Sequence, residues 1–600
     1  MGNILLRFKR GAFLRLERYW KARYGSRSLV LILSMLVGVV AALIAGALHG
    51  LVAFFEKVSG KLESSGSHWF FILFLILPAI GIVLSFLVQK YFGGVRYAKS
   101  LSPLILSLSR RQTRIPFSEM FTHVISSALS VGFGGSAGLE APSVLTGAAI
   151  GSNTGNLFGI DRRQQLLLIG CGGAAAIAAI FRSPIGGILF AIEVLMPEFS
   201  VAALVPMLIS SAVAMVVSRS LFTHEQTLLV INNDWRTDAI PFYFLCGLVC
   251  ALVGVFMIRT AYAMGAWLKK NMPSKWRRLW FGAAVLVVLL ALFPLLRGQG
   301  YTFIARLYDG DLDSIARSAP LLSKLPVPLL LTLLLTAAIF LKVVTSVLTV
   351  DSGGDGGIFA PTMFVGAFTG FAFARLINLT GIIELQEPNF IVVGICGVFT
   401  AVLRAPLTGI FLIADVTASY ILLVPLMIVS SVSWFTARIF ESYSIYLKAL
   451  MEGGLLSGDR DNSMLKRFTV RICLNTNYTV LDAGRRLDDM REKLTDVRSQ
   501  EVFPVLDEKR ELCGIVYLDK MLPLMLDPAL SKSLLIFDLM SPPKGAIAED
   551  DDLALAMKNL ERFKLNHLPV YKKDGSFMGF VSRTDIFRLY RSIVRDGDSY

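Results

Sequence analysis

One carboxylate, Glu140, stands in a phrase of small residues, GGSAGLEAP (residues 134–142), which leads into a long apolar segment. A glycine-rich turn followed by a helix leaves several backbone N–H groups directed at one point, and the helix dipole adds partial positive charge there. Such a point binds an anion. Because an ionisable residue inside a bilayer is costly, it marks a functional site. Glu140 is therefore predicted to be a tethered anion that occupies an anion site and then moves away.

A closely similar phrase recurs in the second half of the chain as GGDGGIFAP (residues 353–361), with Phe359 at the place of Glu140. A second pair of segments, IFRSPIGGILFAIEV (180–194) and VLRAPLTGIFLIADV (402–416), follows the first pair in the same order and at nearly the same spacing. Two halves that each contain a broken apolar helix predict a transporter-type site near the membrane midplane, between the repeats.

The composition predicts a polytopic membrane protein, because 54% of the 600 residues are hydrophobic. Seven runs are near or above the length that spans a bilayer, namely Leu29–Phe55, Trp69–Val88, Val201–Val217, Pro241–Ile258, Leu279–Leu296, Pro328–Leu348 and Leu422–Phe440. Other apolar segments are shorter or interrupted by glycine, which indicates helices that end part-way. Residues 298–326 are expected to form a polar connection.

The charged and sulfur-containing residues exclude several function classes. The net charge is +15, but the basic residues cluster at segment ends, so we expect no nucleic-acid binding. The six cysteines and five histidines show no metal-ligand spacing, so neither a metal site, a cofactor nor a disulfide framework is expected. An enzyme is not expected either, because Glu140 has no partner base, nucleophile or metal cluster in the sequence.

The two ends of the chain differ from the apolar middle. Residues 1–27 are basic with interleaved apolar side chains, typical of an amphipathic helix on a membrane surface or of a positive-inside flank. Both interpretations place the N-terminus in the cytosol. From residue 452 the chain is more charged and repeats internally, with FPV at 503–505 and LPV at 568–570. Two tandem α/β modules are predicted, each preceded by a helix, at 480–492 and 553–562.

Together, GLEAP (138–142), GGIFAP (356–361), the duplicated Arg-x-Pro segments and the C-terminal modules resemble the CLC family of chloride channels and chloride/proton exchangers, with tandem CBS domains. Lys342 and the phrase GQGY (298–301) also resemble the family. The resemblance implies a polytopic α-helical membrane protein of the CLC fold, an inverted repeat with broken helices, followed by an α/β tandem CBS module.

The same resemblance implies the division of the chain. The transmembrane domain is expected at residues 28–451, with repeats at roughly 28–225 and 240–447, and the cytosolic CBS domains at 452–600. Family members are homodimers with one pore per subunit. We therefore expect a multi-pass protein of the cell membrane, in contact with lipid and with both termini in the cytosol.

By the resemblance, Glu140 is the gating glutamate, which competes with the transported chloride. The backbone N–H groups of Ile358 and Phe359 would bind the central anion, and the hydroxyl of Tyr443 would contact it. The Phe359 ring is expected to serve packing. For Tyr443, the alternative of an ordinary interfacial tyrosine stays open.

Three positions depart from the family pattern. Where the family has Gly-Ser-Gly-Ile-Pro, this chain has KSLSP at 99–103. Either Ser100 or Ser102 could be the inner anion ligand, and the register favours Ser100. Leu139 replaces a usually basic residue, which weakens the positive field near the outer site. Val194 stands where exchangers usually carry the glutamate that relays protons. We therefore expect a passive channel, gated by movement or protonation of Glu140, and voltage gating is implied only by the family.

Other functions stay open. A chloride/proton antiporter could relay protons by another route, and the altered 99–103 segment suggests a fluoride-tuned variant. From a different class, a membrane sensor could report nucleotide levels through its CBS pair, although the intact GLEAP and GGIFAP phrases argue against it. Glu193 and its counterpart Asp415 are expected to be structural carboxylates at helix ends.

The second α/β module carries a candidate nucleotide site. Its segment SRTD (582–585) resembles the CBS segment in which a hydroxyl and an acid contact nucleotide, so Ser582, Thr584 and Asp585 are candidates for binding an adenine nucleotide. The first module has Tyr517 and Lys520 at the matching places. Because only one module keeps the pattern, a structural role in stabilising a dimer is the favoured alternative.

Overall fold

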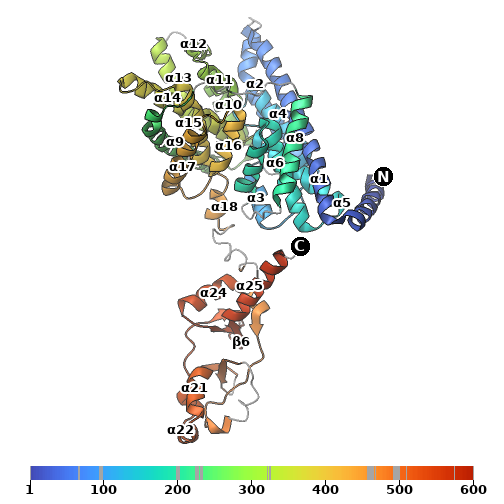
Figure 1. Cartoon of the computed structure of the whole chain (residues 1–600), viewed down its shortest axis with the longest axis vertical. Helices are drawn as coiled ribbons and strands as arrows, with labels where there is room; N and C mark the ends of the chain where they lie inside the picture. The colour runs from blue at the N-terminus through green and yellow to red at the C-terminus, as the bar shows by residue number, and fades with distance from the viewer. Residues whose placement is uncertain are drawn as a thin grey trace. The chain divides into compact units, whose positions relative to one another are not determined.

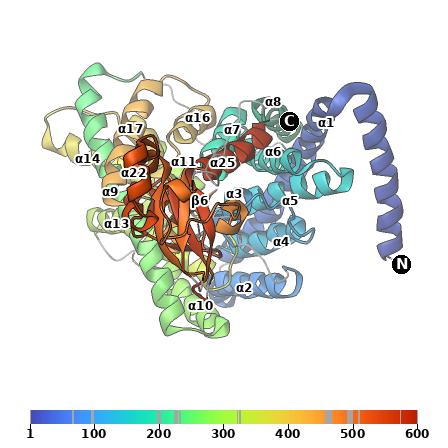
Figure 2. The ribbon, with the colours of Figure 1, turned by 90° about the horizontal axis from the view of Figure 1, so that it is seen from below.

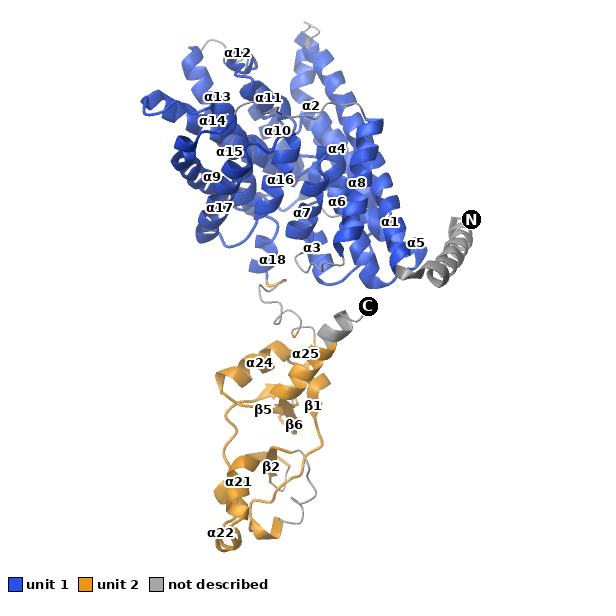
Figure 3. Cartoon of the chain, in the orientation of Figure 1, with its two compact units in different colours: residues 1–453 blue, residues 454–600 orange. Residues whose placement is uncertain are grey.

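The computed structural model describes residues 2–64, 68–93, 99–196, 203–222, 229, 234–319, 322, 326–455, 465, 468–490, 500–507, 510–572 and 574–598, without the side chains of residues 2–26, 64 and 593–598. The chain divides into two compact units, residues 1–453 and 454–600 (Figure 3). The amphipathic pattern predicted at 1–27 involves side chains outside those described, whereas the backbone there belongs to the long helix α1.

Helices build the first unit. Its first half contains α1 (Gly2–Ser64), α2 (His68–Phe92), α3 (Leu101–Ser109), α4 (Glu119–Gly132), α5 (Glu140–Phe158), α6 (Arg162–Phe181), α7 (Pro184–Phe190), a π-helical turn (Ala191–Leu195) and α8 (Leu204–Leu221). Its second half contains α9 (Ile240–Asn271), α10 (Lys275–Leu292), α11 (Tyr301–Tyr308), α12 (Leu312–Arg317), α13 (Val327–Asp351), α14 (Phe359–Thr380), α15 (Glu387–Leu403), α16 (Pro406–Val416), α17 (Leu423–Phe440) and α18 (Lys448–Glu452). In Figure 1, helices α4, α6 and α8 lie to the right and α9, α14 and α17 to the left, and Figure 2 shows the same division from below.

Eight helices among the described residues are long and apolar enough to cross a membrane. Six of them coincide with predicted runs, although residues 201–202 of one run lie outside the description. The other two, α6 and α14, are glycine-containing segments in which most residues are buried inside the protein. The predicted run Leu279–Leu296 is wrong at its end, because α10 ends at Leu292 and Pro294 opens a short 3-10 turn. The expected polar connection at 298–326 contains the two short helices α11 and α12.

Each Arg-x-Pro phrase joins the end of one helix to the start of the next. Arg182 and Arg404 end α6 and α15 in the left-handed region, with φ of 53° and 61°. Each guanidinium donates to a backbone carbonyl beyond a later helix, Phe222 O at 2.7 Å and Glu441 O at 2.5 Å. The following proline opens α7 or α16, where its missing N–H costs nothing. Equivalent positions thus have the same local structure, which confirms the repeat.

The second unit repeats one hairpin. Strands β2 (Val502–Leu506) and β3 (Leu512–Tyr517) pair antiparallel, as do β5 (His567–Tyr571) and β6 (Phe577–Ser582). Both hairpins have the same register and the same irregularity near their turns, at equivalent places in the two modules, which confirms the predicted internal repeat. Strands β1 (Leu474–Asn475) and β4 (Ile547–Ala548) extend the second hairpin into a sheet ordered β1-β6-β5-β4.

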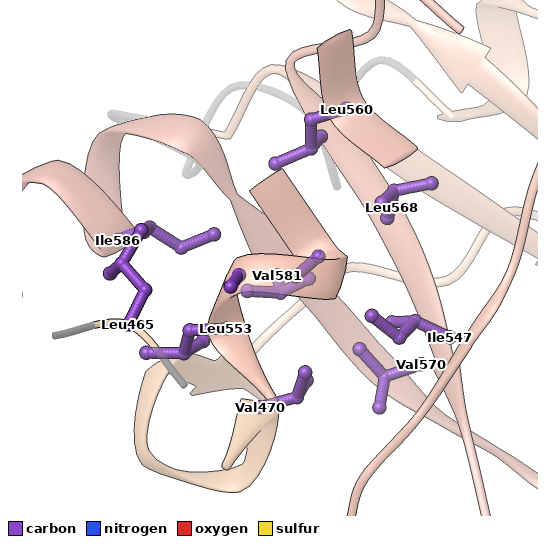
Figure 4. Close-up of a cluster of buried hydrophobic side chains, with 11 residues drawn as sticks. Leu465, Val470, Ile547, Leu553, Leu560, Leu568, Val570, Val581 and Ile586 are labelled. Atoms are coloured by element: carbon purple, nitrogen blue, oxygen red, sulfur yellow. The ribbon is translucent and has the colours of Figure 1, made fainter. Parts of the chain in front are cut away.

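Helices cover these hairpins. They are α21 (Leu518–Met525), α22 (Pro528–Ser533), α23 (Ile536–Leu539), α24 (Leu553–Arg562) and α25 (Arg583–Asp598). Strand residues such as Leu568 and Val581 pack against Leu553 of α24 and Ile586 of α25 (Figure 4). The predicted helix at 553–562 is confirmed by α24. The one at 480–492 is wrong: its described part holds turns and the 3-10 segment Asp488–Met490, because the chain at Leu481 pairs with β2 instead.

Candidate functional site

The two glycine-rich phrases meet at one buried point within the first unit. Gly138 and Gly357, which occupy equivalent positions in the two phrases, exchange both backbone hydrogen bonds at 2.8 Å in an antiparallel bridge. Two segments that pair equivalent residues in this way are related by a local two-fold axis. The bridge therefore relates the halves as an inverted repeat requires, which the sequence alone could not show.

The bridge brings the N-termini of α5 and α14 together. The first bonds within these helices run from Ser143 N to Leu139 O and from Thr362 N to Ile358 O, both at 3.0 Å. The N–H groups of each first turn have no partner within their own helix and remain available to a ligand. Because both helix dipoles present their positive ends there, the point where α5 and α14 begin is suited to an anion.

The Glu140 side chain already occupies this point. It is 1% exposed, and its Oε1 accepts a hydrogen bond of 2.6 Å from the hydroxyl of Tyr301. A Cβ on Gly138 would meet Oε2 of Glu140 and the backbone N of Ala360. The carboxylate is thus folded back over Gly138, beside the first turn of α14, and only a glycine at 138 leaves room for it.

Phe359, the counterpart of Glu140, contributes its ring to an aromatic cluster. The ring centroid lies 4.8 Å from that of Phe399, 5.4 Å from Phe181 and 5.9 Å from Phe190, and the residue is 1% exposed. The expectation that this ring serves packing is confirmed. Ile358 is the N-cap of α14 and Phe359 is its first residue, so the backbone N–H groups of both residues lie at the N-terminus of this helix.

The serine and tyrosine candidates occupy different surroundings. Ser100 is the N-cap of α3 and makes no side-chain capping bond, so its hydroxyl is not committed to the helix. Ser102 donates to the backbone carbonyl of Tyr446 at 2.7 Å. Tyr443 is half-buried. Tyr446 is 5% exposed, its hydroxyl has no hydrogen-bond partner among the described residues, and it lies within range of the Glu140 charge.

Sequence reasoning missed Tyr446 and Tyr301 as members of this site. Tyr446 lies shortly after Tyr443 in the run ESYSIY, so the available signal was the second tyrosine of that run. Tyr301 ends the phrase GQGY, whose only signal in the sequence is its resemblance to the family. Nothing local in either phrase shows which side chain faces Glu140.

Val194, the position at which the resemblance implies a proton relay in exchangers, has an apolar side chain. It is 7% exposed, within the π-helical turn after α7. Its neighbour Glu193 caps α16, accepting from Leu407 N at 3.1 Å, Thr408 N at 2.8 Å and Thr408 Oγ1 at 2.7 Å.

Asp415, in the second half of the chain, makes the equivalent contact to the start of a helix in the first half. It accepts a hydrogen bond of 2.6 Å from Ser183, the N-cap residue of α7. Glu193 and Asp415 therefore each fix the start of the opposite half's helix, and the expected structural role of both carboxylates is confirmed.

Buried polar contacts also fix each phrase to the opposite half. Asp355 accepts from Ser126 and lies 3.1 Å from Nδ1 of His123, both on α4. At the equivalent place in the other phrase, Ser136 lies 3.0 Å from Thr345 Oγ1, and its N–H donates to Thr349 Oγ1 at 3.1 Å. His123 and Asp355 are fully buried, so the polar side chains depend on one another for hydrogen bonds.

In the second unit, the candidate nucleotide residues mostly bond to one another. Ser582 Oγ donates to Asp585 Oδ2 at 2.6 Å and accepts from Asp585 N at 3.0 Å, which caps the start of α25, while Thr584 is exposed. A small pocket beside them is lined by Tyr478, Gln500, His567, Ser582 and Asp585. Within the described ranges, no group of three His, Cys, Asp or Glu side chains is placed to hold a metal ion.

Comparisons with known proteins agree with this arrangement. A family model described as "Voltage gated chloride channel" matches residues 80–438, and a CBS domain model matches residues 536–592. The chain is 30% identical over 336 residues to an H(+)/Cl(-) exchange transporter of Vibrio parahaemolyticus, covering 54% of this chain and 67% of that protein. It is 27% identical over 394 residues to a putative chloride channel protein of Ralstonia nicotianae, covering 63% and 85%. A solved CLC-type fluoride/proton antiporter superposes with a TM-score of 0.56 at 27% identity, covering 70% of this chain and 98% of that one.

Proposed function

This chain belongs to the CLC family and is a multi-pass membrane protein of anion transport, and from that premise we propose that it conducts chloride through a pore gated by Glu140. The observation that carries the proposal is the position of the Glu140 carboxylate, folded over Gly138 against the first turn of α14. A side chain that sits where an anion would bind excludes that anion while it stays there.

The gate would work by competition for the positive ends of α5 and α14. When Glu140 is ionised and seated, it uses the N–H groups and dipoles that chloride needs. Protonation or rotation of the side chain releases them, and the N–H groups of Ile358 and Phe359 then bind chloride. Ser100 and a tyrosine hydroxyl would complete the anion site on its inner side. Tyr446 is favoured over Tyr443 as this tyrosine, because its buried hydroxyl has no hydrogen-bond partner among the described residues.

Passive conduction is favoured over exchange because Val194 cannot carry a proton. The alternative is a chloride/proton antiporter, which is supported by the exchange transporter of Vibrio among its relatives. A fluoride-selective variant is supported by the likeness to the fluoride/proton antiporter and by the altered segment at 99–103.

One measurement separates these functions. The purified protein is placed in planar bilayers under a fixed chloride gradient, and the reversal potential is recorded with and without a pH gradient. A channel reverses at the chloride equilibrium potential whatever the pH gradient. A reversal potential that moves with the pH gradient would establish coupled exchange, and replacement of chloride by fluoride tests the third possibility.

The rest of the assembly is part of the same proposal. Two copies would form a homodimer in the cell membrane, each with its own pore and with both termini in the cytosol. The second unit would act as a cytosolic regulatory module. An adenine nucleotide would bind at Ser582, Thr584 and Asp585, where it would have to replace the hydrogen bond between Ser582 and Asp585.

A further inference from the structure

Tyr301 makes the one side-chain hydrogen bond to Glu140 that the described residues show. Its hydroxyl lies 2.6 Å from Glu140 Oε1 and 3.9 Å from the sulfur of Met363 on α14. A thioether is a weak acceptor, whereas an ionised carboxylate is a strong one. The hydroxyl proton is therefore directed at Glu140.

The loop before α11 holds Tyr301 in this position. Lys342, which is fully buried, donates to the carbonyls of Leu296 and Gly298 at 2.9 Å each. Gly300 then takes a left-handed φ of 91°, and a Cβ there would enter the ring of Phe364. Two carbonyls fixed by one lysine, followed by a turn that only glycine fits, leave the first residue of α11 little freedom to turn elsewhere.

We propose that Tyr301 is a latch for the gate: its hydroxyl holds the ionised Glu140 carboxylate in the anion site. This proposal rests on the proposed role of Glu140 as the gate. Tyr301 is a positioning residue, which acts in the closed pore through its hydrogen bond to Glu140.

The latch depends on the charge of its acceptor. A hydrogen bond to an ionised carboxylate is about twice as strong as one to a neutral acid. The ionisable side chains near Glu140 in the described structure are Tyr301 on α11 and Tyr446 after α17. Protonation of Glu140 thus weakens the latch at the same moment as it removes the charge that competes with chloride.

The test compares Tyr301→Phe with Tyr308→Phe in liposome chloride-efflux assays between pH 4.5 and 8. Tyr308 is a matched control, since it lies two turns along the same helix and lacks the bond to Glu140. Tyr301→Phe is expected to raise efflux at neutral pH roughly ten- to hundredfold, as expected for the loss of a hydrogen bond to a charged group. It also shifts half-maximal activation to higher pH by about one unit. Tyr308→Phe leaves both quantities unchanged.

The same variants in a Glu140→Gln background separate the latch from the gate. With the charged acceptor gone, Tyr301→Phe is expected to cause no further change. A Tyr301→Phe protein with the wild-type pH profile would overturn the latch while leaving the gate intact. An effect that persists in Glu140→Gln would overturn it too, because Tyr301 would then act through its loop. If Glu140→Gln itself behaves like the wild type, the proposed gate fails instead.

A second variant guards against misfolding. Should Tyr301→Phe fail to assemble, Lys342→Met frees the loop that aims Tyr301 without touching the hydroxyl. It is expected to shift the pH profile in the same direction, and an unchanged profile in a folded Lys342→Met protein would count against the latch.

Discussion

Gly138→Ala adds one methyl group at the point where the Glu140 carboxylate is folded back. The new Cβ would meet Glu140 Oε2 and lie 3.0 Å from the backbone N of Ala360. Ala360 belongs to the start of α14 and cannot withdraw, whereas the Glu140 side chain can rotate. The methyl group is therefore expected to displace the carboxylate and open the pore.

The size of the effect follows from the cost of overpacking. Inserting a methyl group into a close-packed site costs about 1–3 kcal/mol. If that cost falls on the seated state of Glu140 alone, the ratio of open to closed pores rises roughly five- to hundredfold, since about 1.4 kcal/mol is a factor of ten. Chloride efflux from liposomes at neutral pH, where the carboxylate would otherwise stay seated, measures this ratio.

The repeat supplies the control. Gly357→Ala makes the equivalent change on the other side of the bridge, where the Cβ would lie 2.8 Å from the Cβ of Ala141 rather than against a carboxylate. Both variants are expected to lower the thermal stability of the protein in detergent, but only Gly138→Ala should raise efflux at neutral pH. Two results would refute the idea that displacement of the Glu140 carboxylate raises efflux. One is equal efflux from the two variants, and the other is an increase in efflux by Gly138→Ala that persists in a Glu140→Gln background.

Three further results are expected. Glu140→Gln should leave the pore conducting at every pH, because the charged plug is gone; single-channel records with ordinary pH-dependent closure would remove Glu140 from the mechanism. His123→Ala should destabilise the protein by about 1–3 kcal/mol, because it takes a buried hydrogen-bond partner from Asp355, and an unchanged melting temperature would contradict this. Burial lowers the pKa of His567 from its usual 6.5, so the folded state binds its proton less readily than the unfolded state. The neutral His567 therefore contributes to the free energy of unfolding fully above pH 6.5, and this contribution declines as the pH falls below that value. In denaturant titrations of the full chain, His567→Gln should make the free energy of unfolding decline less over this pH range.

The sequence predicts those parts of the fold and the site in which a residue's role depends on its neighbours in the chain. A glutamate among glycines before an apolar helix, its repeat with Phe359, and the two matching hairpins of the second unit all depend on short local patterns. The structural role of Glu193 and Asp415 was also predictable, because each stands at a helix end in an equivalent place.

Contacts across long stretches of chain could not be predicted in this way. The bond from Tyr301 to Glu140 joins residues far apart in the sequence and depends on the path of a loop that Lys342 holds. The choice between Tyr443 and Tyr446 depends on how the chain turns after α17, because that turn decides which hydroxyl faces inward. At 480–492 the sequence has helical periodicity, but no helix forms in the described part, because Leu481 pairs with β2 instead.

The bridge between Gly138 and Gly357 also bears on how the protein is made. The two glycines lie in opposite halves of the chain, so the first phrase is synthesised long before its partner exists. Until then, its backbone N–H and C=O groups lack the bonds that a bilayer interior demands. Contacts of such sequence separation form slowly, and the anion site is therefore expected to be among the last parts to assemble. A nascent chain that ends before Gly357 would contain Glu140 but no pore, and would depend on the insertion machinery to shield that phrase until the second half arrives.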